Sequence, residues 1–272
     1  MQNLATHTST PSLRYTQPPS SWHTLLLMAA AWCLLCLFNP SAWAQNRAAK
    51  VIAVAGQAKA IDAQGRERTL EKGAELFAGD KVVTADASLV QVRLNDGGYM
   101  SIRAHTEMVI DQFVYDEKEP SNSNFLVSLL RGGFRSITGQ IGRTNPGGYQ
   151  IRAATATIGI RGTDHEPVLV LDTPEAQAQT QGAPGLYDKV NEGETFITSR
   201  AGVLSLKRGE IGFLPLGANL PPQVLLKIPE FYKTAIRAEP VGAETTAPGP
   251  TPTVPRHLLI SPAPPPPQPL LK

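Results

Sequence analysis

The stretch from Gln150 to Leu171 is the feature that most constrains what this chain can fold into. Its first half, Ala153 to Ile160, consists of alanine, threonine and isoleucine apart from Gly159, a composition that favours a strand over a helix. A second glycine, Gly162, follows the run after Arg161. Gly162 allows a positive backbone φ that Thr163 could not adopt without strain. We therefore predict two strands joined by a tight bend, with the small alanines letting a neighbouring layer approach closely.

Arg161 sits inside this predicted bend, between the two glycines. Its guanidinium carries five donors, which suits it to bind carbonyl oxygens that a bend leaves unpaired. This structural role is the favoured interpretation. An arginine that points into solvent and an arginine that binds a ligand are the two alternatives.

The clearest hairpin lies upstream of the bend. Val90, Val92 and Leu94 alternate with polar residues, which places the three apolar side chains on one face of a strand. The turn Asn95-Asp96-Gly97-Gly98 follows, built from residues that tolerate positive φ, and a second alternating run begins at Met100. Asp96 and Gly97 are therefore predicted to be structural turn residues, with a cation ligand at Asp96 as the alternative.

Short strand-like segments separated by glycine turns continue on both sides of this hairpin. The run 125–130 is apolar on both faces, which predicts a central, fully covered strand. Residues 131–135 and 144–148 are predicted bends, and 172–185 a polar loop. This pattern predicts an all-β domain over residues 45–217, either a β-roll or solenoid-like body or a β-sandwich. A second set of strands is expected within it at 185–215.

The N-terminal part of the chain reads as an export signal. Residues 25–38 form an apolar run that is short for a membrane span, and Ala42-Trp43-Ala44 suits cleavage before Gln45. We expect a signal peptide over residues 1–44 and a periplasmic mature protein. An inner-membrane anchor at residues 25–38 is the alternative, and only that form would contact the membrane. Both cysteines, Cys33 and Cys36, lie inside the run, so a cleaved protein would contain no thiol.

The C-terminal part is predicted to contain one short helix and a disordered tail. Pro229 suits the first helical position, Glu230 the first turn, and Lys233 and Arg237 the last, within an extension spanning residues 218–238. Proline dominates residues 239–272, which cannot bury enough apolar surface to fold. The favoured interpretation of this segment is an extended tether, and the alternative is a proline-rich docking peptide.

The segment Ala156–Thr163 resembles the most characteristic motif of the FecR-domain family of bacterial envelope proteins. Two further segments, Gly79–Thr84 and Leu94–Tyr99, resemble the other common motifs of that family in the right order, and the likeness covers roughly residues 51–215. The resemblance implies a β-roll. Members of the family that this chain resembles include transmembrane regulators. In these, a cytoplasmic helical segment controls a sigma factor while the envelope domain senses a receptor. Only about two dozen residues precede the apolar run here, too few for an independent helical domain. We therefore expect a stand-alone envelope form.

No pattern in the sequence assembles an active site. The histidines after residue 44 are His105, His165 and His257, and they show no metal-ligand spacing. Asp164, His165 and Glu166 are adjacent, but neighbouring side chains of a strand point to opposite faces and cannot form a relay. We therefore expect a non-enzyme without a cofactor or metal.

The remaining function classes are binding functions. The formal charge is +2, and it falls to +1 without residues 1–44, so an affinity for nucleic acid is not expected. An unknown envelope protein is the favoured partner, and peptidoglycan or another wall polysaccharide is the alternative. The polymer would bind a basic stripe, for which the candidate residues are Arg131, Arg135 and Arg143, with Arg152 and Arg161 nearby. Scattered solvated arginines are the simpler interpretation.

Overall fold

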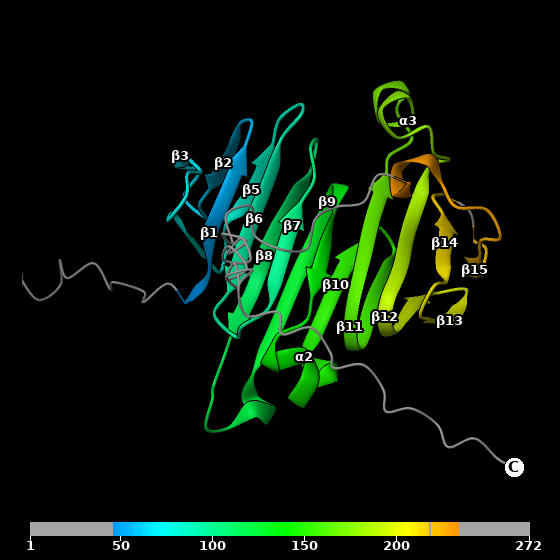
Figure 1. The fold of residues 1–272 in the computed structure, drawn as a ribbon. Coiled ribbons are helices and arrows are strands. Elements are labelled where there is room, and N and C mark those ends of the chain that lie inside the picture. The colour runs from blue at the N-terminus through cyan, green and yellow to red at the C-terminus, as the bar shows by residue number, and fades with distance from the viewer. Residues whose placement is uncertain (1–45, 218, 234–272) are drawn as a thin grey trace, which may run out of the picture. The chain divides into compact units, whose positions relative to one another are not determined.

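The computed structural model describes residues 46–217 and 219–233 of the chain. All strands of this part belong to one 15-stranded sheet, and the neighbours β9 and β10 are the pair that runs parallel (Figure 1). The predicted all-β fold is therefore confirmed. The signal peptide predicted at residues 1–44 and the tail predicted at 239–272 lie outside the described residues.

The sheet divides along β9 (Asn124–Ile137). The first half of β9, up to Arg131, pairs with β8 (Glu107–Val114) and β10 (Tyr149–Ala153). From Gly132 onward the strand pairs instead with β7 (Tyr99–Ile102) and β11 (Ala156–Val170). One strand thus belongs to two layers, which we call the first and the second layer.

On one side of β9 the two layers continue as separate arms. In the first layer, β8 is followed by β5 (Lys81–Thr84), β2 (Ala58–Ile61) and β3 (Glu67–Thr69). In the second layer, β7 is followed by β6 (Leu89–Leu94), β1 (Arg47–Ala55) and β4 (Glu75–Phe77). The predicted hairpin is confirmed as β6 and β7, with Val92 opposite Met100.

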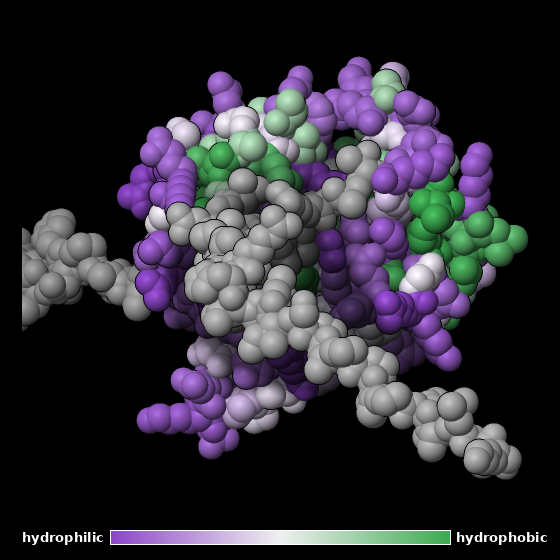
Figure 2. Space-filling view, viewed as in Figure 1, coloured by the Kyte–Doolittle hydropathy of each residue, from purple (hydrophilic) through white to green (hydrophobic). Residues whose placement is uncertain are grey.

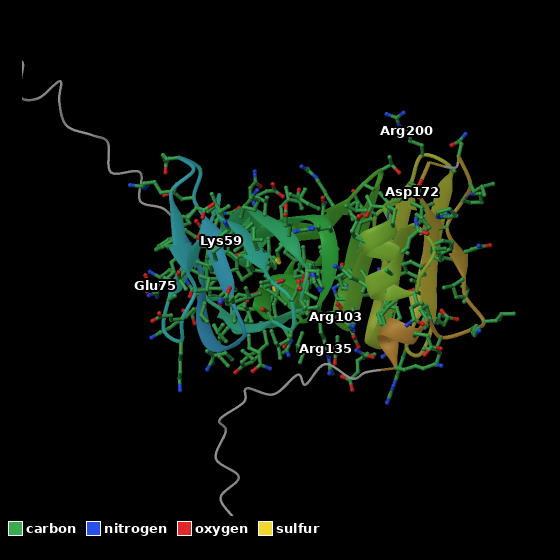
Figure 3. The ribbon with its side chains drawn as sticks, turned by 90° about the horizontal axis from the view of Figure 1, so that it is seen from above. Lys59, Glu75, Arg103, Arg135, Asp172 and Arg200 are labelled. Carbon is green, nitrogen blue, oxygen red and sulfur yellow. The ribbon has the colours of Figure 1, made fainter. Side chains whose placement is uncertain are left out.

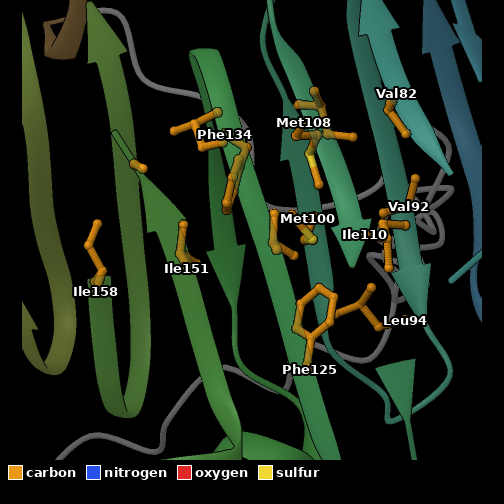
Figure 4. Close-up of a cluster of buried hydrophobic side chains, with 14 of the residues drawn as sticks. Val82, Val92, Leu94, Met100, Met108, Ile110, Phe125, Phe134, Ile151 and Ile158 are labelled. Carbon is orange, nitrogen blue, oxygen red and sulfur yellow. The ribbon is translucent and has the colours of Figure 1, made fainter. Parts of the chain in front are cut away.

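The core lies between these two arms (Figure 4). Strand alternation turns every second side chain inward, so both layers contribute to one apolar cluster. The first layer supplies Val82, Met108, Ile110 and Phe125, and the second supplies Val92, Leu94, Met100 and Phe134, all of them buried. Burial of side chains of this size contributes roughly 1.5–3 kcal/mol each, which makes this cluster the main source of stability.

On the other side of β9 the layers are joined by two more long strands, β11 and β12 (Gly185–Ser199). The first half of β11 pairs with the second half of β12, which carries β13 (Gly202–Lys207). The second half of β11 pairs with the first half of β12, next to β14 (Ile211–Pro215) and β15 (Gln223–Val224). The body is therefore one open sheet folded over on itself, the roll among the predicted alternatives, and the strands expected at 185–215 are β12, β13 and β14.

Three predictions of local structure need correction. The run 125–130 is covered on one face only, because Phe125, Val127 and Leu129 are buried whereas Leu130 is 44% exposed. The loop expected at 172–185 contains the helix α3 (Pro174–Thr180), whose N-terminus is capped by the Thr173 side chain. The C-terminal helix is a single 3-10 turn, η3 (Glu230–Tyr232); Pro229 precedes it, and Arg237 lies outside the described residues.

The remaining helical elements are short. They are η1 (Pro120–Asn122), α2 (Gln140–Thr144) and η2 (Pro146–Gly148). The first lies in the connection between β8 and β9, and the last lies in the predicted bend at 144–148. Each of the two 3-10 turns has proline in its first turn, where the missing N–H is not needed.

Candidate functional site

Glycines with positive φ mark the points where the three long strands bend between the layers. They are Gly132 in β9 (φ 74°), Gly162 in β11 (φ 57°) and Gly193 in β12 (φ 77°). The pairing register of β11 with β12 shifts at this bend. Arg161 pairs with Glu194 and Asp164 pairs with Glu192, whereas Gly162 and Gly193 lie between these pairs and are not paired. A Cβ on Gly193 would lie 2.1 Å from the carbonyl oxygen of Gly162. The predicted bend around Gly162 is therefore present, inside a strand that continues on both sides of it.

Thr163 and Thr138 close this bend. The Thr138 hydroxyl accepts a hydrogen bond from the Thr163 backbone N–H (2.8 Å), and the Thr138 N–H donates to the Thr163 carbonyl (2.9 Å). Both side chains are buried. Buried backbone groups need such partners, so Thr138 performs the structural task that the sequence assigned to Arg161.

Arg161 lies elsewhere. Its side chain is 72% exposed, with a guanidinium nitrogen 3.6 Å from the Glu194 carboxylate. The guanidinium also lies over the ring of Phe196, 5.8 Å from its centroid. These contacts connect neighbouring strands on the outer surface of the first layer, and they include no carbonyl oxygen of the bend. Gly159 lies on the same strand, and an added Cβ there would meet nothing within 4 Å.

Asp96 and Gly97 form the predicted turn, and Asp96 has a second structural role. Its carboxylate accepts hydrogen bonds from the N–H groups of Gly98 (3.0 Å) and Ile141 (3.1 Å), so it holds α2 against the hairpin. Burial raises the pKa of Asp96. The two hydrogen bonds lower this pKa again, but only in part, so it stays above its ordinary value. Gly97 has a φ of 84° and is exposed. Among the described residues no group of three acidic, histidine or cysteine side chains is placed to hold a metal ion.

The predicted alternation of Asp164, His165 and Glu166 along β11 is present. Asp164 and Glu166 face outward from the second layer, where Asn191 donates to both carboxylates (3.2 and 3.0 Å). His165 faces inward and is fully buried. The three side chains therefore form no relay.

The outward carboxylates anchor a network of ion pairs that sequence reasoning missed. Arg135 on β9 binds Asp164 at 2.5 Å, and Arg103, just after β7, binds Glu166 at 2.6 Å. Lys189 on β12 reaches Glu166 at 3.2 Å. Figure 3 shows Arg103 and Arg135 close together on the same side of the molecule. These contacts fasten together four strands that are far apart in sequence.

The electrostatics of the network favour ionised Glu166. Burial alone would raise the pKa of this carboxyl, but the hydrogen bond from Asn191 and the charges of Lys189 and Arg103 outweigh burial, so its pKa lies below the ordinary value. The Asp164 carboxylate likewise raises the pKa of the Arg135 guanidinium. The network is therefore charged under ordinary conditions.

The C-terminal turn η3 is attached to the same network. The Tyr232 hydroxyl donates to the Glu166 carbonyl (2.5 Å), and Arg103 donates to the Phe231 carbonyl (2.7 Å). The Tyr232 ring is buried in a small apolar cluster with Val168 and Tyr187 on the outer face of the second layer. The segment after β15 is therefore held firmly against the sheet.

On the inner face, His165 pairs with Asp188 on β12. The distance from His165 Nδ1 to Asp188 Oδ1 is 2.9 Å, and both side chains are fully buried. Within the described part of the chain, His165 Nε2 and Asp188 Oδ2 have no hydrogen-bond partner. Neither residue lines any of the five clefts described on the body.

The predicted polymer-binding arginines are separated by the fold. Arg131 is paired with Glu107 at 3.0 Å, and Arg135 belongs to the network on the second layer. Arg143 is exposed near the end of α2. Arg152 and Arg161 do share one face of the first layer, because Arg152 pairs with Thr157, four residues before Arg161. Binding by Arg131, Arg135 and Arg143 stays a prediction.

The described sheet has open edges at β3, β4, β13 and β15, and β13 is the one with an exposed apolar side chain in a longer strand. Among the described residues β13 pairs only with β12, which leaves its other side without a strand. Val203 on this edge is 66% exposed. Further apolar side chains gather on the adjacent segment 220–228, namely Leu220, Val224, Leu226 and Ile228, all exposed. Figure 2 shows hydrophobic residues over the end of the sheet that carries β14 and β15. We call Val203 with these four residues the apolar edge.

Taken together, these observations define an all-β domain whose charged groups hold bent strands in place. The segment 80–184 matches the family model described as FecR protein, so the chain contains a FecR domain and the resemblance is confirmed for these residues. A FecR domain indicates a regulatory or signalling role. In the described part, no helix has the length and apolar character needed to cross a membrane.

Solved structures with some likeness include two crystal structures of a "putative anti-sigma factor" from Parabacteroides distasonis. They are 16% and 17% identical to this chain, with TM-scores of 0.38 and 0.39. Each match covers 53% of this chain and 57% of the other, so this chain spans little more than half the length of those proteins. A "cell surface anchoring domain" matches with 24% identity and a TM-score of 0.22, covering 23% of this chain and 82% of that one. No curated protein matches the sequence.

Proposed function

We propose that this protein is a non-catalytic regulatory module of the bacterial cell envelope that binds another protein through its apolar edge. The single observation that carries the proposal is the open side of β13 with exposed Val203, next to the segment that carries exposed Leu220, since a Cβ on Gly202 would lie 3.5 Å from Pro221. An uncovered strand presents a row of backbone donors and acceptors, and native proteins usually block such edges unless they use them. The partner is therefore a protein that offers an extended segment with apolar side chains.

The apolar character of the edge supports a protein partner over a polymer. Contiguous exposed apolar residues on a soluble domain mark binding sites more often than isolated ones do. The charged residues within β13 and residues 220–228 are Lys207 and Lys227, both exposed, against five exposed apolar side chains. An extended segment would gain backbone hydrogen bonds from β13 and bury these side chains at the same time.

The proposed location is the periplasm. The support is the FecR domain together with the predicted export signal ending at Ala44. N-terminal sequencing of the protein purified from an envelope fraction is expected to begin at Gln45. A chain that begins at residue 1, or that fractionates with the cytosol, contradicts this location.

The interaction is tested by photo-crosslinking in cells. A photoreactive residue at Val203 is expected to capture one protein in a saturable manner, whereas the same residue at exposed Glu71, in the turn before β4, is not. Val203→Asp should reduce capture from a second reporter position at Leu226. Equal capture from Glu71, or capture unaffected by V203D, would show that the edge is not the binding surface.

A wall polysaccharide is a second candidate, favoured by the outer face of the first layer. A shallow depression of about 450 Å³ there is lined by Gln150, Thr157, Arg161, Phe196 and Thr198 among others. A ring beside hydrogen-bonding groups suits a sugar. Sedimentation with purified wall material, reduced by Phe196→Ala and unchanged by Val203→Asp, would favour this function; the reverse pattern would favour the protein partner.

A further inference from the structure

A large cleft of the described body lies apart from the apolar edge. It has a volume of about 770 Å³ and is enclosed by α3, the end of β11, the bend of β9 and η3. Its apolar lining residues are Leu89, Val168, Leu169, Leu171, Ala176 and Phe231. Ligand sites ordinarily measure about 300–1,000 Å³ and are lined mostly by such side chains. The cleft is thus large enough for a few apolar side chains of a peptide.

The charged residues that line the cleft indicate which charge an occupant should carry. Arg131 is neutralised by Glu107 at 3.0 Å, and Arg103 by Glu166 at 2.6 Å. Glu175 on α3 also lines the cleft, and no contact of its side chain is found among the described residues. The lining charge without an ion-pair partner in the described body is therefore that of Glu175. An occupant with apolar side chains next to a cation fits better than an anionic amphiphile.

The helix α3 forms one wall of the cleft and has little packing of its own. None of the residues of α3 is buried, although Ala176 is partly buried beside the cluster that contains Tyr232. A seven-residue helix with no buried side chain gains little from its own packing, because helices of this length are marginal without tertiary contacts. Apolar side chains inserted between α3 and Phe231 would bury both walls.

We propose that the segment Leu258-Leu259-Ile260 of the same chain occupies this cleft, with Arg256 facing Glu175. The segment is an uninterrupted apolar run between Pro255 and Pro262 and is preceded by a cation, which matches the lining in both respects. The description of the body ends at Lys233, two residues after Phe231, itself a wall of the cleft. The 24 residues 234–257 reach up to about 80 Å when extended, far more than the return requires.

The connection also gives this segment an advantage over free partners. A segment tethered within reach of its site has an effective concentration on the order of millimolar. A free peptide of the same sequence would need to reach that concentration to compete. The proposal does not rest on the proposed function, since the cleft and the apolar edge share no residue.

Photo-crosslinking within the full chain tests the proposal. A photoreactive residue replaces Gln179, an exposed residue of α3 that lines the cleft, and the control position is Glu71. We expect mass spectrometry to find an intramolecular crosslink from position 179 to residues 256–260, with a yield that does not depend on protein concentration. No such crosslink is expected from position 71.

Two matched tail variants sharpen the result. Leu259→Asp is expected to lower the crosslink yield by about tenfold, since it replaces a buried leucine worth roughly 1.5–3 kcal/mol with a charge. Leu270→Asp, in the other short apolar run of the tail, should leave it unchanged. Binding of a neutral dye such as Nile red should rise in L259D and not in L270D.

Each alternative outcome contradicts the proposal. A crosslink to residues 270–271 assigns the cleft to another segment, and a crosslink that grows with concentration assigns it to a second copy. An absence of tail crosslinks from position 179, with dye binding equal in all variants, shows that the tail does not enter the cleft. Because both tail substitutions lie outside the described body, a failure to fold is excluded by an unchanged far-UV circular dichroism spectrum, while the unfolding midpoint of L259D should fall slightly as the docked segment is lost.

Discussion

The ionisable side chains on the two faces of β11 differ in how many partners they have. On the outer face, Asp164 and Glu166 are each held by an arginine and by Asn191. On the inner face, His165 and Asp188 have one contact with each other, and one polar atom of each is left without a partner in the described body. In the described body the outer network leaves one buried donor without a partner, Arg103 Nε, while both carboxylates are held; the inner pair leaves one polar atom of each residue without a partner.

This difference separates two uses of charge in one strand. The outer network combines two buried carboxylates with cations that keep partial exposure, since the Arg103, Arg135 and Lys189 side chains are 18%, 21% and 25% exposed, and its contacts fasten strands and the C-terminal turn η3. The inner pair lies in the apolar core between the layers, where an unsatisfied polar group costs free energy. Its value to the protein is therefore specificity of packing rather than stability, since apolar residues would fill the same space more cheaply.

Breaking the inner pair should have the largest effect. Asp188→Ala leaves His165 buried without a partner and is expected to lower the free energy of unfolding by about 3–5 kcal/mol, as measured by urea denaturation. The double variant His165→Phe/Asp188→Leu should recover most of this loss, because it removes both polar groups. If the double variant is as unstable as D188A, the pair stabilises the fold and the contrast between the faces is lost.

Removing Arg103 from the outer network should have a smaller effect. Arg103→Ala removes a charge-assisted hydrogen bond to Glu166 and one to the Phe231 carbonyl, each worth about 1.5–3 kcal/mol at most. Because Arg103 is partly exposed, we expect a net loss of about 1–3 kcal/mol. Hydrogen exchange should accelerate at residues 230–232 more than in β6 or β8. Uniform acceleration would mean that the arginine supports the sheet and not the turn η3.

The network should also add an acid-sensitive component to stability. Since the pKa of Glu166 is lowered in the folded protein, its contribution is fully present above the unfolded pKa and is lost as pH falls through the folded pKa. Glu166→Gln should therefore flatten the dependence of the unfolding midpoint on pH below about 4.5, the usual range of glutamate. An unchanged slope in E166Q would show that Glu166 ionises equally in both states.

Local signals predicted much of this fold. The alternation at Val90–Leu94, the turn at Asp96 and Gly97, and the positive φ of Gly162 all follow from nearby residues. The helix α3 was missed, although Thr173-Pro174-Glu175 carries a cap, a proline and an acid in the order typical of a helix start. The glutamines that follow were interpreted as loop composition.

The contacts of the site could not be predicted in the same way. Arg103 and Glu166 are 63 residues apart, and His165 and Asp188 are 23 apart. Their meeting depends on the register of β7, β9, β11 and β12, which is fixed by pairing and packing of the whole sheet. Period-two alternation along β11 did give the correct facing of Asp164, His165 and Glu166, because that property is local.

The smallest change in the free energy of unfolding is expected on substitution of Arg161, the residue predicted from the sequence to have the main structural role in the bend. Arg161→Ala removes a surface contact with Glu194 and a stacking contact with Phe196 from a side chain that is 72% exposed, so the expected loss is below about 1 kcal/mol. Thr138→Val, which removes the buried hydroxyl bound to Thr163 N–H, should cost about 1–3 kcal/mol. The two variants, compared by thermal and urea unfolding, decide which residue closes the bend. A larger loss of stability in R161A than in T138V would contradict this assignment. It would mean that the Arg161–Glu194 pair stabilises the first layer as the Arg103–Glu166 pair stabilises the second.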